Sequence, residues 1–123
     1  MNVLLIDDSK TMRNIQRRIL NQIGYETVEE ARDGQEALIK IEWVRPDLML
    51  VDWDMPEMDG LSFVRQYRNQ GGTAMIIMVM SEAQKSRANE AIEAGVNHTI
   101  VKPFTPDTLS HRINETLRGS AAA

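Results

Sequence analysis

The sequence predicts an α/β fold in which helices cover both faces of a parallel sheet. Five short apolar runs alternate with five stretches of helical period along the chain. The third run, Leu48–Val51, is apolar at every position, as in a parallel strand that is covered on both faces. This alternation favours right-handed βαβ crossovers and one doubly wound sheet. The length of 123 residues corresponds to a single domain.

The first elements are a strand, a helix and a weaker strand. Val3–Ile6 is an apolar strand, and apolar residues recur at helical spacing through Lys10–Gln22. Gly24 follows that helix where a C-cap belongs. Glu26–Ala31 predicts a second strand, centred on Val28.

The middle of the chain contains a helix, the third strand and a long loop. Asp33-Gly34 interrupts the second strand before the helix, and Pro46 ends that helix. The third strand, Leu48–Val51, is followed by a loop at 52–60. A third helix, which includes Val64, comes next.

The last part of the chain repeats the alternation, with glycines between its elements. A proline at the first helical position favours a final helix. The expected elements are a strand at Met75–Met80, a helix at Lys85–Ala94, a strand at Thr99–Val101 and a helix that starts at Pro106 and includes Leu117. Residues 119–123 are predicted to be a disordered tail or a vector remnant.

Composition excludes several classes of protein. The 18 acidic residues outnumber the 14 basic ones, which disfavours nucleic acid as a partner because phosphate neutralisation needs a basic face. The chain has no cysteine, so disulfides and cysteine metal sites are excluded. The N-terminus lacks the pattern of a signal peptide, and the longest apolar run, Ala74–Met80, is too short to span a membrane. We therefore expect a cytoplasmic domain without membrane insertion.

Charged side chains follow three of the expected strands. Asp7 and Asp8 end the first strand, Asp52 ends the third, and Lys102 ends the fifth. The carboxyl ends of the strands form the binding edge of an open parallel sheet. Clustered carboxylates repel one another and recruit a hard cation, and a site with room for water suits Mg²⁺. With Lys102 facing a carboxylate nucleophile, the arrangement suits phosphoryl transfer.

A purely structural interpretation of these acids is also open. Acidic residues after strands are common helix caps and turn formers, and Asp8 or Ser9 would then cap the first helix. Three acids and a lysine at separate strand ends favour the functional interpretation.

The chain contains three motifs whose order and spacing are informative. They are Asp7-Asp8-Ser9, Asp52–Gly60 and Lys102-Pro103-Phe104. Together they resemble the receiver domain of two-component response regulators, and most closely its single-domain, CheY-like chemotaxis type. The resemblance extends from Val3 to Leu117. It implies a receiver domain at residues 1–118 with a flavodoxin-like (βα)5 fold, in which the strand order is 2-1-3-4-5.

The resemblance also implies the chemistry of the site. Asp52 would accept a phosphoryl group from a phosphohistidine on a sensor histidine kinase. Asp8, Asp52 and the backbone carbonyl of Asp54 would hold Mg²⁺, or Mn²⁺ in its place, with Asp7 acting through water. Lys102 would bind a phosphoryl oxygen.

The family further implies how the signal leaves the domain. A downstream protein would dock on the surface of the fourth helix, fifth strand and fifth helix. The chain would catalyse only its own phosphorylation and dephosphorylation and would not otherwise be an enzyme. The Lys102–Pro103 bond corresponds to one that is often cis in the family. Whether the pathway is a flagellar switch, another chemotaxis step or a phosphorelay stays open.

The chain departs from the family pattern at two switch positions. The hydroxyl expected at the end of the fourth strand falls on Met80, and the aromatic expected in the fifth strand falls on Thr99. A shift of the alignment by one residue would place the hydroxyl on Ser81. Met80 cannot donate a hydrogen bond to a phosphoryl oxygen, so a weak or rewired conformational response is predicted. The alternative is that Met80 only fills the core, since volume-conserving exchanges are tolerated there.

Two other functions compete with this one. An apolar strand followed by Asp52-x-Asp54 imitates the nucleophile motif of haloacid-dehalogenase-type phosphohydrolases, but position 56 is Pro and the motif is on the third strand, not the first. A pseudo-receiver, which binds partners without phosphorylation, is favoured by Met80 and Thr99. The intact carboxylates and lysine count against it.

A few further residues have simpler expected roles. The Asp54 side chain adds negative charge at the mouth of the site or is only a solvated loop acid. Trp53 is expected to report on the site, and Trp43 to pack on a helix face. His98 and His111 are expected at the surface, because neither belongs to a nucleophilic pattern.

Overall fold

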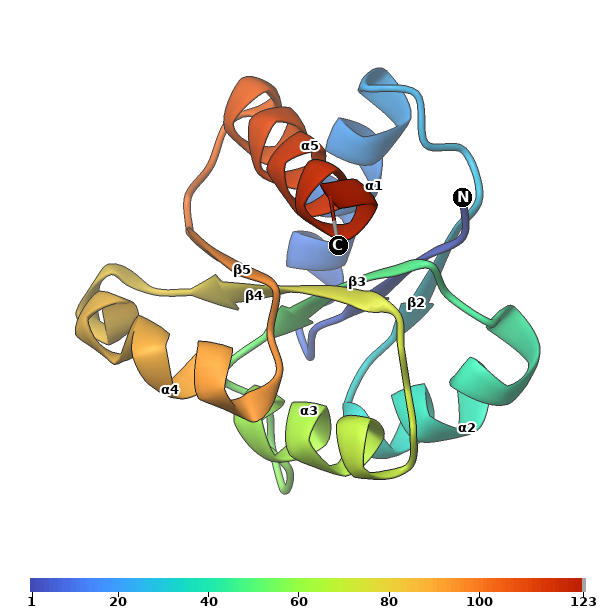
Figure 1. Cartoon of the computed structure of the whole chain (residues 1–123). Helices are drawn as coiled ribbons and strands as arrows, with labels where there is room; N and C mark the ends of the chain where they lie inside the picture. Colours follow the sequence, from blue (N-terminus) through green and yellow to red (C-terminus); the bar gives the residue numbers. More distant parts are fainter. Residues whose placement is uncertain (123) are drawn as a thin grey trace.

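The computed structural model describes residues 1–122 and confirms the doubly wound α/β fold. Its five strands form one parallel sheet in the order β2-β1-β3-β4-β5, as the resemblance implies (Figure 1). The strands are β1 (Val3–Ile6), β2 (Val28–Ala31), β3 (Leu48–Asp52), β4 (Met75–Met80) and β5 (His98–Val101). The helices are α1 (Lys10–Gln22), α2 (Gly34–Val44), α3 (Gly60–Asn69), a 3-10 turn η1 (Glu82–Arg87), α4 (Ala88–Ala94) and α5 (Pro106–Ala122).

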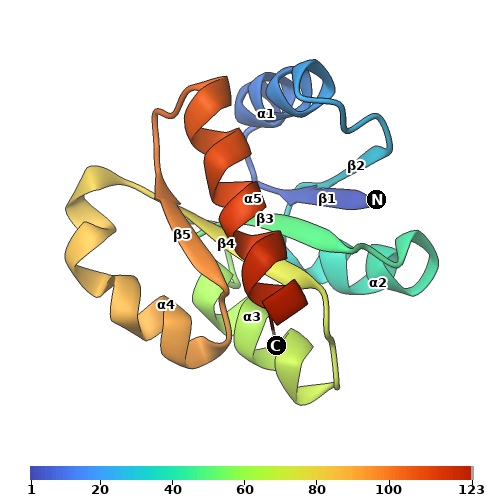
Figure 2. The same cartoon turned by 45° about the horizontal axis from the view of Figure 1, so that its top comes forward.

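Helices cover both faces of the sheet. α1 and α5 lie on one face, and α2, α3 and α4 lie on the other (Figures 1 and 2). Because side chains alternate along a strand, Leu4 and Ile6 join the core cluster beneath α2, α3 and α4, whereas Val3 and Leu5 join the cluster beneath α1 and α5. Burying each such side chain stabilises the fold by about 1.5–3 kcal/mol.

The strand register aligns the carboxyl ends of the strands. Ile6 lies opposite Val51 in the pairing of β1 with β3, and Met80 lies opposite Val101 in the pairing of β4 with β5. The residues that follow β1 and β5 therefore lie at the same edge of the sheet as Asp52, the last residue of β3.

The segment after β4 differs from the expected helix at Lys85–Ala94. It begins with the 3-10 turn η1, and only its second half, α4, is α-helical. Gln84 explains the tight turn, because its backbone N–H donates to the Ser81 carbonyl at 3.0 Å and its side-chain oxygen accepts the Ser81 N–H at 2.9 Å.

The ends of three other elements also differ. β2 begins at Val28 rather than at Glu26, and β5 begins at His98 rather than at Thr99. α5 continues through Ala122, past Leu117, and a disordered tail or vector remnant at residues 119–123 stays a prediction. Residue 123 lies outside the described residues.

The expectation that Trp43 packs on a helix face is wrong. Trp43 is 62% exposed on α2, and Ile39, one turn earlier, is 68% exposed. The side of α2 that packs against the core instead presents Ala37, Leu38 and Ile41. Within the part of the chain that the structure describes, no helix is both long and apolar enough to cross a membrane.

Replacing Leu50 by Ala tests the core. Leu50 is buried in β3 within the cluster beneath α1 and α5, and its truncation leaves a cavity. We expect the free energy of unfolding to fall by about 2–5 kcal/mol in urea titrations. The control Ile39→Ala removes an exposed side chain and should change it by less than about 0.5 kcal/mol. Equal losses in both variants would contradict the assigned core.

Candidate functional site

Three carboxylates meet at the carboxyl edge of the sheet. Asp7, Asp8 and Asp52 each offer one oxygen, and these oxygens lie within 4.8 Å of one another. Asp7 is 1% exposed and Asp52 is 4% exposed, whereas Asp8 is an exposed residue. The fold thus brings together the acids that the sequence predicts for a metal site.

Asp7 is held by the start of α1. The Ser9 N–H donates to Asp7 Oδ1 at 2.8 Å, and Ser9 Oγ caps α1 by accepting the Met12 N–H at 3.2 Å. Ser9, rather than Asp8, is therefore the helix cap. Burial raises the pKa of Asp7, although the Ser9 N–H and the charge of Lys102 oppose this effect. The other oxygen, Oδ2, is buried and has no hydrogen-bond partner among the described residues.

Lys102 reaches the site from the position directly after β5. Its ammonium donates to Asp52 Oδ1 at 3.2 Å, and its backbone N–H donates to the Met80 carbonyl at 2.9 Å. The peptide bond between Lys102 and Pro103 is cis, as the resemblance implies. The pKa of Asp52 is raised to about 6, first by burial and then by the charge of Asp7, while the charge and hydrogen bond of Lys102 lower it. The Lys102 ammonium lowers the pKa of Asp52 by less than burial and the charge of Asp7 raise it, so the pKa stays above its ordinary value.

The donor set fits a hard divalent cation. All three clustered groups are carboxylates, and the unpartnered Oδ2 of Asp7 is a buried acceptor of the kind that a cation or its bound water satisfies. Asp8 adds a solvent-facing ligand, which leaves one side of the cluster open to water or phosphate. The residues present are therefore compatible with Mg²⁺.

The mouth of the site contains contacts that the sequence interpretation missed. The Asp54 carboxylate accepts hydrogen bonds from Gln84 Nε2 at 2.9 Å to each oxygen, and so does not join the carboxylate cluster. The Arg87 guanidinium carbon lies 4.8 Å from the centre of the Trp53 ring. Asp8 and these side chains line an open hollow of about 460 Å³.

The switch positions are not part of the carboxylate cluster. Met80 is 0% exposed and belongs to the core cluster beneath α2, α3 and α4. Thr99 is half-buried in β5 opposite Met78, and Ser81 immediately precedes η1, where its backbone N–H donates to the Gln84 side chain. The Met80 side chain therefore packs in the core. This packing is independent of any effect that a missing hydroxyl at position 80 has on signalling.

Some of the missed residues had a signal in the sequence and others had none. Ser81-x-x-Gln84 matches the capping-box pattern, which predicts the bond between these residues. Arg13 donates to the Asp7 carbonyl and to Glu30 Oε1, but it does so across α1, β1 and β2. Sequence spacing does not predict such a contact, because it depends on how the helix docks on the sheet.

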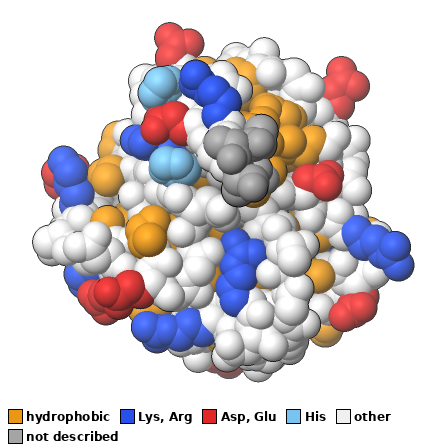
Figure 3. Space-filling view, viewed as in Figure 1, with side chains coloured by type: hydrophobic (Ala, Val, Ile, Leu, Met, Phe, Trp, Pro, Cys, Tyr) orange, Lys and Arg blue, Asp and Glu red, His pale blue; other side chains and the backbone are white. Residues whose placement is uncertain are grey.

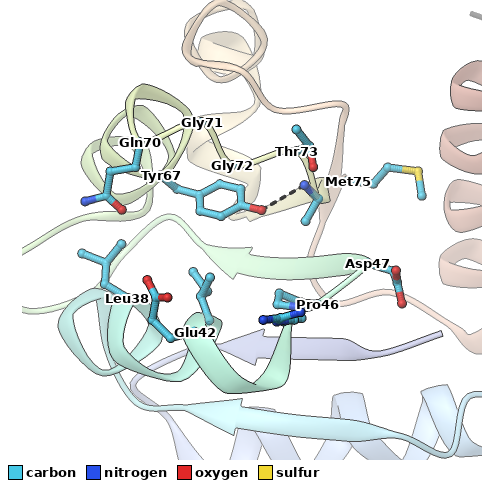
Figure 4. Close-up of a pocket in the computed structure, with 13 residues that line it drawn as sticks. Leu38, Glu42, Pro46, Asp47, Tyr67, Gln70, Gly71, Gly72, Thr73 and Met75 are labelled. Atoms are coloured by element: carbon cyan, nitrogen blue, oxygen red, sulfur yellow. Dashed lines mark hydrogen bonds between the residues drawn. The ribbon is translucent and has the colours of Figure 1, made fainter.

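A second groove lies away from the carboxylates. It has a volume of about 500 Å³ between α2 and the turn that follows α3, near the amino ends of β3 and β4 (Figure 4). The Tyr67 hydroxyl accepts the Ala74 N–H there at 2.9 Å. Figure 3 shows acidic and basic side chains interspersed over the described part of one molecular face. Neither feature belongs to the carboxylate site.

Comparison with known proteins agrees with this geometry. Residues 3–114 match the model of the response regulator receiver domain. The chain belongs to this family. It is 42% identical over 120 residues to the chemotaxis protein CheY1 of Helicobacter pylori strain J99, a match that covers 95% of this chain and 97% of that protein.

Solved structures agree as well. Chemotaxis protein CheY4 of Vibrio cholerae is 36% identical, with a TM-score of 0.85 and coverage of 94% of this chain and 97% of that one. A two-component response regulator with a GGDEF domain gives a TM-score of 0.89 at 31% identity, and the match covers 97% of this chain but 49% of that one. The chain is thus a CheY-like receiver domain, a phosphoacceptor module of two-component signalling, which implies a histidine kinase as partner.

Replacing Asp52 by Asn should stabilise the metal-free domain at neutral pH. The folded pKa of about 6 lies above the ordinary value of 3.8, so ionisation of Asp52 favours the unfolded state. This destabilisation is full above pH 6 and disappears as the pH falls below 3.8. We expect a gain on the order of 1–3 kcal/mol at neutral pH that shrinks toward pH 4.

Urea unfolding in EDTA across this pH range measures the gain. Glu26→Gln, which neutralises an exposed acid, is the matched control and should show no such trend. A gain for Asp52→Asn that does not depend on pH would contradict the assignment.

Proposed function

We propose that Asp52 is the phosphoacceptor and receives the phosphoryl group of a phosphohistidine on a sensor histidine kinase. The observation that supports this most directly is the buried Asp52 carboxylate, which lies 3.2 Å from the Lys102 ammonium and beside the oxygens of Asp7 and Asp8. Asp8, Asp52 and the Asp54 carbonyl would hold Mg²⁺, or Mn²⁺, with Asp7 acting through water. The bound ion would supply further neutralisation of phosphoryl charge.

The transfer is a displacement at phosphorus. An ionised Asp52 oxygen attacks the phosphorus, the bond from phosphorus to the histidine nitrogen breaks, and the imidazole leaves with the electron pair and takes up a proton. Lys102 neutralises charge on the phosphoryl oxygens, and the fixed position of its ammonium means that little reorganisation is needed. Water later cleaves the acyl phosphate and returns Asp52 as a carboxylate. The chain therefore catalyses only its own phosphorylation and dephosphorylation.

The output would be noncovalent docking of a downstream protein on the face formed by α4, β5 and α5. Ile92 on α4 offers an exposed apolar contact there. The names of the relatives favour a chemotaxis pathway, and we propose a cytoplasmic location.

Acetyl phosphate tests the acceptor assignment. With Mg²⁺, intact-protein mass spectrometry should show one added phosphoryl group, and EDTA or Asp52→Asn should abolish it. Lys102→Ala should slow the reaction by roughly a hundredfold, because it removes one preorganised charge. Lys85→Ala, which removes an exposed lysine of η1, should react like the wild type.

Two outcomes would select the competing functions. Absence of any adduct in the wild type would support a pseudo-receiver adaptor that phosphorylation does not regulate. Sustained, Asp52-dependent hydrolysis of p-nitrophenyl phosphate would support the haloacid-dehalogenase-type phosphohydrolase.

The switch at positions 80 and 99 is proposed to be weak or rewired. The buried Met80 side chain has no hydrogen to donate to a phosphoryl oxygen, and Thr99 has no aromatic ring to move. With beryllofluoride and Mg²⁺, the double variant Met80→Thr with Thr99→Tyr should show a larger hydrogen-exchange response over α4, β5 and α5 than the wild type. A large wild-type response that the double variant leaves unchanged would contradict this proposal.

A further inference from the structure

Two contacts join the loop after β3 to the turn η1 at the mouth of the site. Gln84 Nε2 donates to Asp54 Oδ1 and Oδ2 at 2.9 Å each. Arg87, one turn later, places its guanidinium over the Trp53 ring at 4.8 Å from the ring centre. Both contacts connect residues directly after Asp52 with the segment that leads into α4.

The amide of Gln84 is bonded at both ends. Its oxygen accepts the backbone N–H of Ser81 at 2.9 Å, while its nitrogen binds the Asp54 carboxylate. Ser81 is the first residue after β4, and Asp54 is the second residue after Asp52. Because a carboxamide is planar and short, a displacement of Asp54 must either move η1 or break one of these hydrogen bonds.

The contacts are weak enough for the site to disrupt. Asp54 and Arg87 are exposed, and Arg87 also pairs with the Glu90 carboxylate at 2.7 Å. Hydrogen bonds and cation–π contacts at exposed positions are worth little compared with their buried equivalents. A ligand at Asp52 that interacts differently with the open and closed arrangements can therefore shift their populations.

Phosphorylation would provide that difference. A phosphoryl group adds negative charge beside Asp52, which repels the Asp54 carboxylate and attracts the Arg87 guanidinium. In addition, a cation that uses the Asp54 carbonyl would constrain the same residue whose carboxylate binds Gln84. Both effects act on the two contacts between the loop and η1.

We infer that Gln84 and Arg87 form a latch that couples occupancy of Asp52 to the position of η1 and α4. The latch is Gln84 bonded to Asp54 together with Arg87 over Trp53, and both contacts are present in this structure. Through these contacts, a change at Asp52 would alter the position of α4 without the participation of Met80 or Thr99. The inference rests on the proposed function of Asp52 and adds the positioning residues through which that site signals.

Hydrogen exchange of residues 82–94, with and without beryllofluoride and Mg²⁺, tests the latch. In the wild type, ligand should speed exchange in η1. In Gln84→Ala, exchange in η1 should be faster by roughly threefold to tenfold before any ligand is added, and ligand should add little. Lys85→Ala is the matched control, because Lys85 lies in the same turn and its ion pair with Glu82 is 3.9 Å long and exposed. It should behave like the wild type.

A double-mutant cycle separates the latch from a general loosening of η1. Asp54→Asn and Gln84→Ala remove opposite ends of one hydrogen bond, so the double variant should exchange no faster than the faster single variant. Arg87→Ala should alter Trp53 fluorescence in the ligand-free domain, because it uncovers the ring.

The outcomes distinguish this inference from the proposed function. If the wild type binds beryllofluoride normally but Gln84→Ala responds like Lys85→Ala, or if the two single effects simply add, the latch is overturned alone. If the wild type binds no beryllofluoride and forms no phosphoryl adduct, the acceptor role of Asp52 is overturned, and the coupling with it.

Discussion

The buried pair of carboxylates at the carboxyl edge of the sheet constrains the rest of this molecule. Asp7 and Asp52 are almost fully buried, and both pKa values are raised mainly because burial disfavours the charged form. The single ammonium of Lys102 compensates for only part of this cost. The cluster is retained because adjacent parallel strands hold it rigidly, and the two apolar layers of the core keep those strands in register. A cation or a phosphoryl group would therefore interact with charges that the fold has already brought together.

The fold could be predicted largely from the sequence, because βαβ alternation restricts topology and a continuous apolar run identifies a central strand. The carboxylates followed from the same rules, since parallel strands end at one edge. Two predictions, an α-helix that starts at Lys85 and a packed Trp43, were wrong for local reasons. Side-chain bonding between Ser81 and Gln84 tightens the chain into η1, and helical period alone does not distinguish a 3-10 turn from an α-helix. Trp43 is exposed because, within residues 1–122, no neighbouring element covers its side of α2, and a periodic pattern does not show which side stays uncovered.

Met80 illustrates how one position can belong to the core and to the site. Its side chain lies in the same apolar cluster as Phe63 and Ala91, from α3 and α4. Its backbone carbonyl accepts the N–H of Lys102 and so helps to position the ammonium. A change of side chain at position 80 therefore leaves the backbone link to Lys102 intact. The absence of a hydroxyl at position 80 therefore does not prevent the charged groups from assembling.

The charges around the mouth of the site provide a physical link between the acceptor Asp52 and helix α4. Asp8, Asp54 and Asp59 are the acidic residues that line the hollow, and Arg87 is the cation among its described lining residues. Arg87 already divides its interactions between the Glu90 carboxylate and the Trp53 ring. An anion that arrives at Asp52 competes for this guanidinium, and any shift of Arg87 toward the anion weakens its hold on Trp53 and on Glu90 of α4. The same negative charge would repel the Asp54 carboxylate. Because both side chains connect to the segment from η1 to α4, an electrostatic change at the acceptor has a direct mechanical consequence at the helix.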